Sequence, residues 1–348
     1  MPMSMRPQAH DIIRTWAFYT IVKAWMHHDK LPWENIIISG HVLSSGKDKI
    51  SKSKENESIT PENLLSRYSA DVIRFWTASG TLGQDIAFSE TQLTIGQKLI
   101  TKLWNAFKFC NEHLSSPVRP DFGPIVPSLS REGGDQPQLD ASNEWILHQS
   151  TECFKQYQKY FDQNEFGLAL DTAEKFFWKD FCDSYLELIK DQLFNPDKYS
   201  KESVDATKWT LHHVGLRILQ LYAPYLPYIT EQLYEIVYQK GIGINSIHQT
   251  KYAEVQKEFN FEQSAYLMEK INNLISEVRK LKTEQQLSLK TGLQELEIYG
   301  SGVNELKSHE QLIKGITQAV NIIYKEKEIE KSEILKKDDV WIAKVKVL

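Results

Sequence analysis

The stretch Asn35–Ser58, with the sequence NIIISGHVLSSGKDKISKSKENES, joins an apolar segment to a polar one and decides how the first part of the chain folds. Residues 35–43 are mostly apolar and β-branched and end near small residues, which is typical of a parallel strand buried on both faces. Residues 44–58 are mostly Ser, Lys, Gly and acidic side chains that cannot form a core, so they predict a loop. Ligands of open α/β sheets bind beyond the carboxyl ends of strands, which makes this loop a candidate binding site.

The loop carries chemical groups that suit a polyphosphate. Lys49 and Lys52 supply ammonium groups that neutralise phosphate charge, and Ser51 and Ser53 supply hydroxyl donors. The alternative is a solvated surface loop, because runs of charged residues usually face water. Composition alone favours that alternative, so the residues around the loop decide between the two.

The segments on either side of the loop have helical periodicity. Residues 10–28 predict a helix that should pack on a parallel sheet, of which only the strand near 35–43 is visible. Thr60-Pro61 and Ser69 are start signals for two further helices. Longer helices are predicted over residues 92–114, 140–162, 165–194, 202–223 and 224–240. No strand pattern interrupts these helices, which indicates a helical bundle.

The end of the chain changes character. A helix is predicted over residues 262–286, and then residues 293–299 and 340–348 alternate as strands do, with a helix near 305–317 between them. The expected fold is therefore an α/β remnant over residues 1–90, an all-α bundle over 91–250 and a small α+β module over 251–348.

Composition excludes several classes of protein. The 348 residues carry a formal net charge of −5, which excludes a general polycation but allows a local basic patch that contacts phosphates. Three widely spaced cysteines without a C-x-x-C pair argue against a disulfide framework or a zinc site and fit a reducing compartment. The sequence has no apolar run of membrane-spanning length and no signal peptide, so we expect a cytoplasmic protein without a membrane partner.

Several short motifs resemble those of one enzyme family. Lys49–Ser53 (KISKS) resembles the K-M-S-K-S loop of class I aminoacyl-tRNA synthetases, with Ile50 as an apolar anchor in place of Met. The other matches, in chain order, are residues 6–16 (RPQAHDIIRTW), 39–43 (SGHVL), 68–76 (YSADVIRFW), 83–89 (GQDIAFS), 102–106 (KLWNA), 177–187 (FWKDFCDSYLE), 221–231 (LYAPYLPYITE) and 246–248 (SIH). The resemblance covers essentially the whole chain and is to valine enzymes of the archaeal-like type, with isoleucine enzymes as the nearest alternative.

The resemblance implies roles for named residues. In the loop, Lys52 would stabilise the pyrophosphate charge that develops in the transition state, assisted by Lys49, while Ser51 and Ser53 bind ATP. This is catalysis by positioned cations, which loop closure over ATP would bring into place.

Three residues outside the loop are also implied in the adenylate site. Asp11 would hold the ribose hydroxyls, Ile12 would contact the amino-acid side chain and His41 would touch the adenine. Ala9 stands where the family usually has Gly. Without the resemblance, Asp11 and Ile12 are simply the start of a helix, with Asp11 favoured by its dipole, and His41 is an ordinary core or surface histidine.

The helical and terminal parts offer candidate RNA contacts. Arg279, Lys280 and Lys282 form a basic stripe that would contact tRNA phosphates, and a solvated helix face is the alternative. Aromatic residues of the bundle, such as Trp104 and Tyr185, lie at helical spacing and are interpreted as core rather than as base-stacking platforms.

The implied protein is an ATP-dependent ligase of valine and tRNA-Val, with ATP and Mg²⁺ as its substrate complex and no tightly bound metal. Residues 1–90 would be the C-terminal part of its Rossmann-type catalytic domain, followed by an anticodon-binding bundle and a tRNA-contacting module. The family's H-I-G-H motif and editing domain are absent from these residues, so an N-terminal half of the same enzyme is an expected partner and the chain alone is expected to be inactive. A non-catalytic tRNA-binding module remains the alternative.

Overall fold

The computed structural model describes residues 2–44, 60–114, 139–251, 259–300, 302–326, 332–337 and 340–346. The chain divides into two compact units. The first consists of Met1–Phe109, Phe154–Glu174 and Ile218–Lys251, and the second of Cys110–Cys153, Lys175–Arg217 and Tyr252–Leu348. Among the described residues, no helix is long and apolar enough to cross a membrane.

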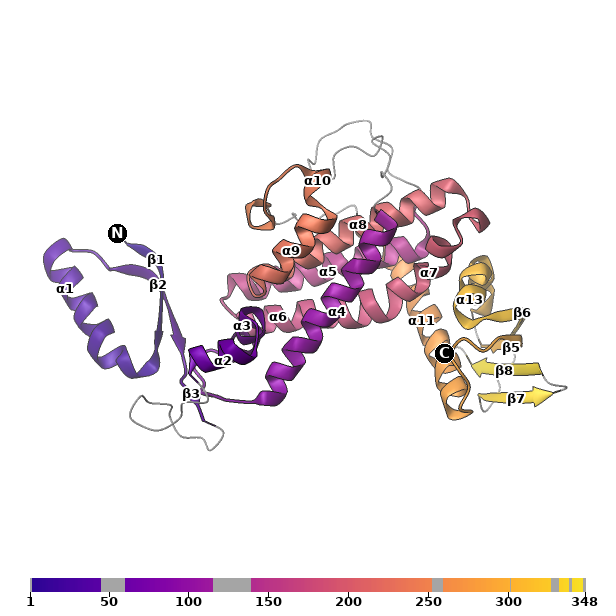
Figure 1. Cartoon of the computed structure of the whole chain (residues 1–348), viewed down its shortest axis with the longest axis horizontal. Coiled ribbons are helices and arrows are strands. Elements are labelled where there is room, and N and C mark those ends of the chain that lie inside the picture. Colours follow the sequence, from indigo (N-terminus) through magenta and orange to yellow (C-terminus); the bar gives the residue numbers. More distant parts are fainter. Residues whose placement is uncertain are drawn as a thin grey trace. The chain divides into compact units, whose positions relative to one another are not determined.

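A β–α–β element opens the first unit (Figure 1). Strands β1 (Met3–Ala9) and β2 (Trp33–Ser39) pair in parallel, with Ala9 opposite Ser39. The predicted helix between them is confirmed. It is continuous and consists of a 3-10 turn (His10–Ile12), a π-helical turn (Ile13–Ala17) and α1 (Phe18–His28). The expectation that residues 1–90 show only one strand of the sheet was wrong. The sequence of β1, MSMRPQA, contains a proline and polar residues, so it lacks the apolar pattern of a buried strand.

The β–α–β element leaves much apolar surface exposed. The side chains of Trp16, Phe18, Tyr19, Trp25 and Met26 are each more than half exposed. From the 3-10 turn to the end of α1, only Ala17 is buried. Two strands and one helix therefore do not bury the apolar residues that they carry.

A second, shorter pair of strands begins three residues after the end of β2. Strand β3 (Val42–Leu43) pairs in parallel with β4 (Ile86–Ala87). Gly40 lies between β2 and β3, and a Cβ added there would sit 2.0 Å from the backbone oxygen of Gln84. Only a glycine lets the two chain segments approach this closely.

Two helices follow residues 45–59. Helix α2 (Pro61–Arg67) starts at Thr60 and α3 (Ala70–Ala78) starts at Ser69, and both caps accept a hydrogen bond from a backbone N–H as predicted. Leu64, Val72, Trp76 and Leu93 form a buried apolar cluster, against which Val42 of β3 packs together with other partly buried residues.

The helical bundle predicted for the middle of the chain is confirmed (Figure 1). Its helices are α4 (Glu90–Leu114), α5 (Ala141–Asp162), α6 (Phe166–Lys175), a π-helical segment (Phe176–Tyr185), α7 (Leu186–Phe194), α8 (Lys201–Tyr222), α9 (Pro227–Val237) and α10 (Gln239–Ile242). Short 3-10 turns lie at Pro196–Lys198 and Ile247–Gln249. Tyr185 is fully buried, as expected for core, whereas Trp104 is 40% exposed.

A buried polar network joins helices within the second unit. The Tyr185 hydroxyl donates to Asn143 Oδ1 at 2.7 Å, and Asn143 Nδ2 donates to Thr207 Oγ1 at 3.0 Å. Thr207 Oγ1 in turn donates to Gln192 Oε1 at 2.8 Å. Buried polar groups that are paired in this way hold α5, α7 and α8 in one register.

The second unit ends in an α+β module. Helix α11 (Glu262–Glu284) precedes a four-stranded sheet in the order β6-β5-β8-β7 (Figure 1). The strands are β5 (Leu293–Tyr299), β6 (Ala319–Lys325), β7 (Glu333–Lys337) and β8 (Val340–Lys346), with α12 (Val303–Leu306), a 3-10 turn (Lys307–His309) and α13 (Glu310–Thr317) between β5 and β6. The expected strands β5 and β8 are confirmed, and β6 and β7 were not predicted.

Candidate nucleotide site

Strands β1 and β2, which pair in parallel, end at the same edge. Ala9 ends β1 and is followed by His10 and Asp11, while Ser39 ends β2 and is followed by Gly40 and His41. Parallel pairing thus brings together side chains that are about thirty residues apart in the sequence. This is the edge at which open α/β sheets bind ligands.

Two histidines and two carboxylates gather at this edge. The rings of His10 and His41 meet edge to face, with centroids 4.5 Å apart. His41 Nε2 lies 3.7 Å from Asp11 Oδ2, and His10 Nε2 lies 3.6 Å from Asp85 Oδ1. The side chain of His41 is 18% exposed and that of Asp11 is 45% exposed, so the group lines an open edge where a ligand can approach.

Asp85 fixes the backbone of the site. Its Oδ1 accepts a hydrogen bond of 2.7 Å from the backbone N–H of His41. The backbone N–H of Ile86 donates to the His41 carbonyl at 2.9 Å, and that of Gly83 donates to the Ile38 carbonyl at 2.8 Å. Residues 83–86 therefore hold the backbone on both sides of Gly40 in place.

Sequence reasoning found part of this group. It singled out Asp11, Ile12 and His41, and the structure brings Asp11 and His41 together, with the partly buried Ile12 next to Asp11 in the same 3-10 turn. It missed His10 and Asp85. Asp85 had a signal in the GQDIAFS motif, but no periodic pattern indicates that its carboxylate accepts a hydrogen bond from a backbone N–H 44 residues earlier.

The predicted phosphate-binding residues Lys49, Ser51, Lys52 and Ser53 lie outside the described residues. The described chain reaches Ser44 on one side and resumes at Thr60 on the other. Strand β3 (Val42–Leu43) directly follows His41 and ends one residue before the last described residue on this side, Ser44.

His10, Asp11 and His41 could also hold a metal ion. Each offers one ligand atom, and these atoms lie within 4.8 Å of one another. Two imidazoles and one carboxylate suit a transition metal such as Zn²⁺, whereas Mg²⁺ prefers oxygen ligands and keeps several waters. This group therefore does not match the Mg²⁺ that accompanies a nucleotide.

The basic stripe of α11 has two different parts. Lys280 is exposed and Arg279 is partly exposed, with a 3.4 Å hydrogen bond from Arg279 Nη1 to the Asp183 carbonyl. Lys282 is only 1% exposed, and its ammonium donates to the carbonyls of Leu289, Thr291 and Thr317 at 3.1, 2.7 and 2.9 Å. Burial, and then the charge of Arg279, lower the pKa of Lys282. Its donors are engaged inside the protein, so of these three described residues Arg279 and Lys280 remain candidates for phosphate contact.

Two family models match this chain. Residues 1–89 match tRNA synthetases class I (I, L, M and V), and residues 143–298 match the anticodon-binding domain of tRNA ligase. The first match includes the histidine and carboxylate edge, and the second includes most of the described bundle and α11.

The curated relatives agree with these models. The chain is 38% identical over 324 residues to a valine–tRNA ligase of Ehrlichia ruminantium strain Gardel, covering 93% of the chain and 38% of that protein. It is 37% identical over 327 residues to a valine–tRNA ligase of Rickettsia prowazekii strain Madrid E, covering 94% of the chain and 39% of that protein. The chain thus spans less than half the length of the relatives that it matches.

Among solved structures, the chain resembles the LeuRS of Agrobacterium radiobacter K84, which was crystallised as a ternary complex with tRNA and LeuAMS. The TM-score is 0.52 at 16% identity, covering 74% of this chain and 30% of that one. At this identity the likeness concerns the fold.

Proposed function

Because the chain belongs to the class I aminoacyl-tRNA synthetases and matches their valine enzymes along 93% of its length, we propose that it is part of a valine–tRNA ligase. In the first step of the proposed reaction, a carboxylate oxygen of valine attacks the α-phosphorus of ATP, and the bond to the bridging oxygen breaks to release pyrophosphate. In the second, the terminal ribose hydroxyl of tRNA-Val attacks the carbonyl carbon of the valyl-adenylate. The new ester forms, AMP leaves and the hydroxyl proton is released.

The convergence of Asp11 and His41 at the carboxyl edge of β1 and β2 supports this proposal most directly. In the proposed complex with ATP, the Asp11 carboxylate accepts hydrogen bonds from the ribose hydroxyls, and His41 lies against the adenine. Ile12 contacts the valine side chain. Gly40 and Asp85 hold the His41 turn in place, so they position the site without touching the nucleotide.

Lys49 and Lys52 supply the positive charge of the site. In the proposal, Lys52 stabilises the charge that grows on the pyrophosphate, Lys49 assists, and Ser51 and Ser53 donate to phosphate oxygens. Mg²⁺ enters with ATP as part of the substrate and neutralises the same phosphates. The described residues end at Ser44, three residues after His41, and this short separation in the sequence supports placing the lysines beside a nucleotide bound at the edge.

The bundle and the C-terminal module would bind the tRNA. We assign residues 1–90 to the catalytic part, 91–250 to the anticodon-binding part and 251–348 to a tRNA-contacting module. Arg279 and Lys280 are the proposed phosphate contacts, since both side chains reach solvent.

A second α/β segment is the proposed partner of the β–α–β element. The exposed aromatic side chains of α1, such as Trp16 and Trp25, need a covering surface. Both amide atoms of Gln8, which is 7% exposed, are buried without a hydrogen-bond partner among the described residues. An N-terminal half that adds parallel strands would cover the aromatic residues and pair this amide. We place the assembled enzyme in the cytoplasm, which the buried and widely spaced thiols of Cys110, Cys153 and Cys182 support.

Pyrophosphate exchange tests the proposal. The complete enzyme should catalyse valine-dependent exchange between ATP and pyrophosphate, with isoleucine a much poorer substrate. A Lys52→Ala change should lower the exchange rate constant by roughly 10²–10³-fold, whereas Lys47→Ala, in the same loop, serves as the matched control. Exchange that depends on isoleucine would move the assignment to the isoleucine enzymes. Tight binding of tRNA-Val with no exchange by the complete protein would favour a non-catalytic tRNA-binding module.

A further inference from the structure

Helix α3 holds the start of α9 through two charged side chains, Asp71 and Arg74 (the α3 clamp). Arg74 Nε donates to the Tyr225 carbonyl at 3.1 Å, and Arg74 Nη2 donates to the Pro224 carbonyl at 2.7 Å. Asp71 accepts from the backbone N–H groups of Tyr228 and Ile229 at 3.3 and 2.7 Å. Since Asp71 and Arg74 are one turn apart on α3, both act on the same short segment of the bundle.

The signs of the charges match the groups that they meet. Leu226 occupies the N-cap of α9 and provides no side-chain acceptor, so the Asp71 carboxylate supplies the missing cap from another helix. A negative charge is favoured at this end by the helix dipole. Asp71 is 3% exposed, and its burial raises its pKa, whereas the bonds from Ile229 and Tyr228 and the charge of Arg74 lower it.

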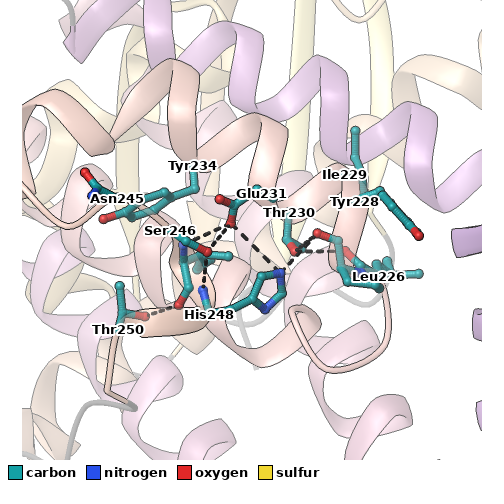
Figure 2. A network of polar contacts seen from close by, with 12 residues as sticks. Leu226, Tyr228, Ile229, Thr230, Glu231, Tyr234, Asn245, Ser246, His248 and Thr250 are labelled. Atoms are coloured by element: carbon teal, nitrogen blue, oxygen red, sulfur yellow. Dashed lines mark hydrogen bonds and ion pairs between the residues drawn. The ribbon is translucent and has the colours of Figure 1, made fainter.

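The start of α9 also contacts the segment 246–248 (Figure 2). His248 Nε2 lies 3.3 Å from the Pro227 carbonyl and 3.9 Å from Glu231 Oε2. The same Glu231 oxygen accepts from Ser246 Oγ at 2.9 Å and from the backbone N–H of Ile247 at 3.0 Å. These contacts tie the segment 246–248 to the start of α9.

The opposite face of α3 reaches both ends of the lysine-rich loop. Val72 and Trp76 belong to the apolar cluster in which Leu64 lies in α2, after the loop, and Val42 lies in β3, before it. Gly167 of α6 meets the other end of α3, where an added Cβ would lie 3.1 Å from the Gly80 carbonyl oxygen. α3 is thus packed between the segments that flank residues 45–59 and the bundle helices α6 and α9.

We propose that Asp71 and Arg74 are positioning residues that hold the bundle segment 224–231 at a fixed place relative to the nucleotide edge, so that tRNA bound to the bundle presents its acceptor end to the adenylate. This rests on the proposed function. The clamp acts through helix position and does not touch ATP or valine. Loss of the clamp should therefore lower the rate at which the valyl group is transferred to tRNA and leave the rate of valyl-adenylate formation unchanged.

The test compares three measurements on the complete enzyme that contains this chain. The Asp71→Asn and Arg74→Gln variants should lower kcat for aminoacylation of tRNA-Val by about tenfold or more, because small misplacements of reacting groups are costly. Valine-dependent pyrophosphate exchange and the Kd for tRNA-Val should stay within about twofold of the unsubstituted enzyme. All assays are run well below the unfolding temperature of each variant.

Two further variants separate positioning from mere stability. Arg67→Gln removes a solvent-exposed arginine of α2 that pairs with Glu90, and all three measurements should remain unchanged. Arg74→Lys keeps the charge but not the two-pronged geometry, so it should restore part of the lost transfer rate. If Asp71→Asn does not fold, Arg74→Gln and Arg74→Lys carry the same prediction.

The outcomes have distinct meanings. Transfer rates unchanged in Arg74→Gln would overturn the clamp, and so would exchange that falls in parallel with transfer, since that indicates damage to the nucleotide edge. A weakened Kd with unchanged kcat would also overturn it, because the residues would then act in binding. An unsubstituted enzyme without exchange would instead refute the proposed function.

Discussion

Replacement of Lys282 should destabilise the C-terminal module far more than its place in a basic stripe suggests. Its ammonium donates to three backbone carbonyls, those of Leu289, Thr291 and Thr317, and the side chain is 1% exposed. In Lys282→Met the volume is kept, but three carbonyl acceptors lose their donor: the buried one of Thr317, and those of Leu289 and Thr291 in part-buried hydrogen bonds. Each unsatisfied acceptor costs about 1–3 kcal/mol and the surroundings relax in part, so we expect a loss of about 3–5 kcal/mol. Lys282→Ala should lose slightly more, because the packing of the stem goes as well.

Urea denaturation followed by the far-ultraviolet signal measures this loss. With a slope of about 2 kcal/mol per M, the midpoint of the transition that includes α11 should fall by about 2 M. Lys280→Ala is the matched control, since Lys280 is exposed on the same helix, and it should change stability by less than about 0.5 kcal/mol. A Lys282→Met protein as stable as the unsubstituted chain would show that the three carbonyls are satisfied without the ammonium, and would refute the reasoning.

Three further outcomes are expected. Gly40→Ala should destabilise the first unit by about 1–3 kcal/mol in thermal denaturation, because its Cβ would meet the Gln84 carbonyl, whereas Gly241→Ala, with open space around it, should not. Burial raises the pKa of Asp180 to about 6, above the unfolded value of 3.8. The folded state therefore loses stability as pH rises through that range, and Asp180→Asn should be the more stable protein at pH about 7.5, with the difference vanishing near pH 4. Lys280→Ala should weaken tRNA-Val binding. It should also reduce the slope of log Kd against log salt concentration by about 1, which corresponds to one phosphate contact, and an unchanged slope would exclude that contact.

The elements predicted correctly are those whose signals are local. The caps Thr60 and Ser69 bond to N–H groups three residues ahead, so the residue types alone indicate where α2 and α3 start. The long helices of the bundle show their buried face every three to four residues. For the same reason, Tyr185 was correctly taken as core.

The elements that were missed depend on distant partners. Strand β1 is defined by its pairing with β2, about thirty residues later, and β6 by its pairing with β5 across α12 and α13. Neither has a strict alternation of apolar and polar residues, since each is only partly buried. Their hydrogen bonds are made by the backbone, which carries no signal of its own in the sequence.

The candidate site divides in the same way. The motifs around Asp11, His41 and the lysine-rich loop indicated the family and predicted the nucleotide edge from residue types and order alone. Only the tertiary structure showed that His10 and Asp85 complete that edge, that Lys282 faces three carbonyls rather than solvent, and that Asp71 caps a helix that starts 156 residues later. The physical reason is the distance along the chain over which each interaction acts. Propensity, capping and chemical type act within a few residues, whereas the direction of a charged side chain is set by whichever distant backbone groups folding leaves without a partner.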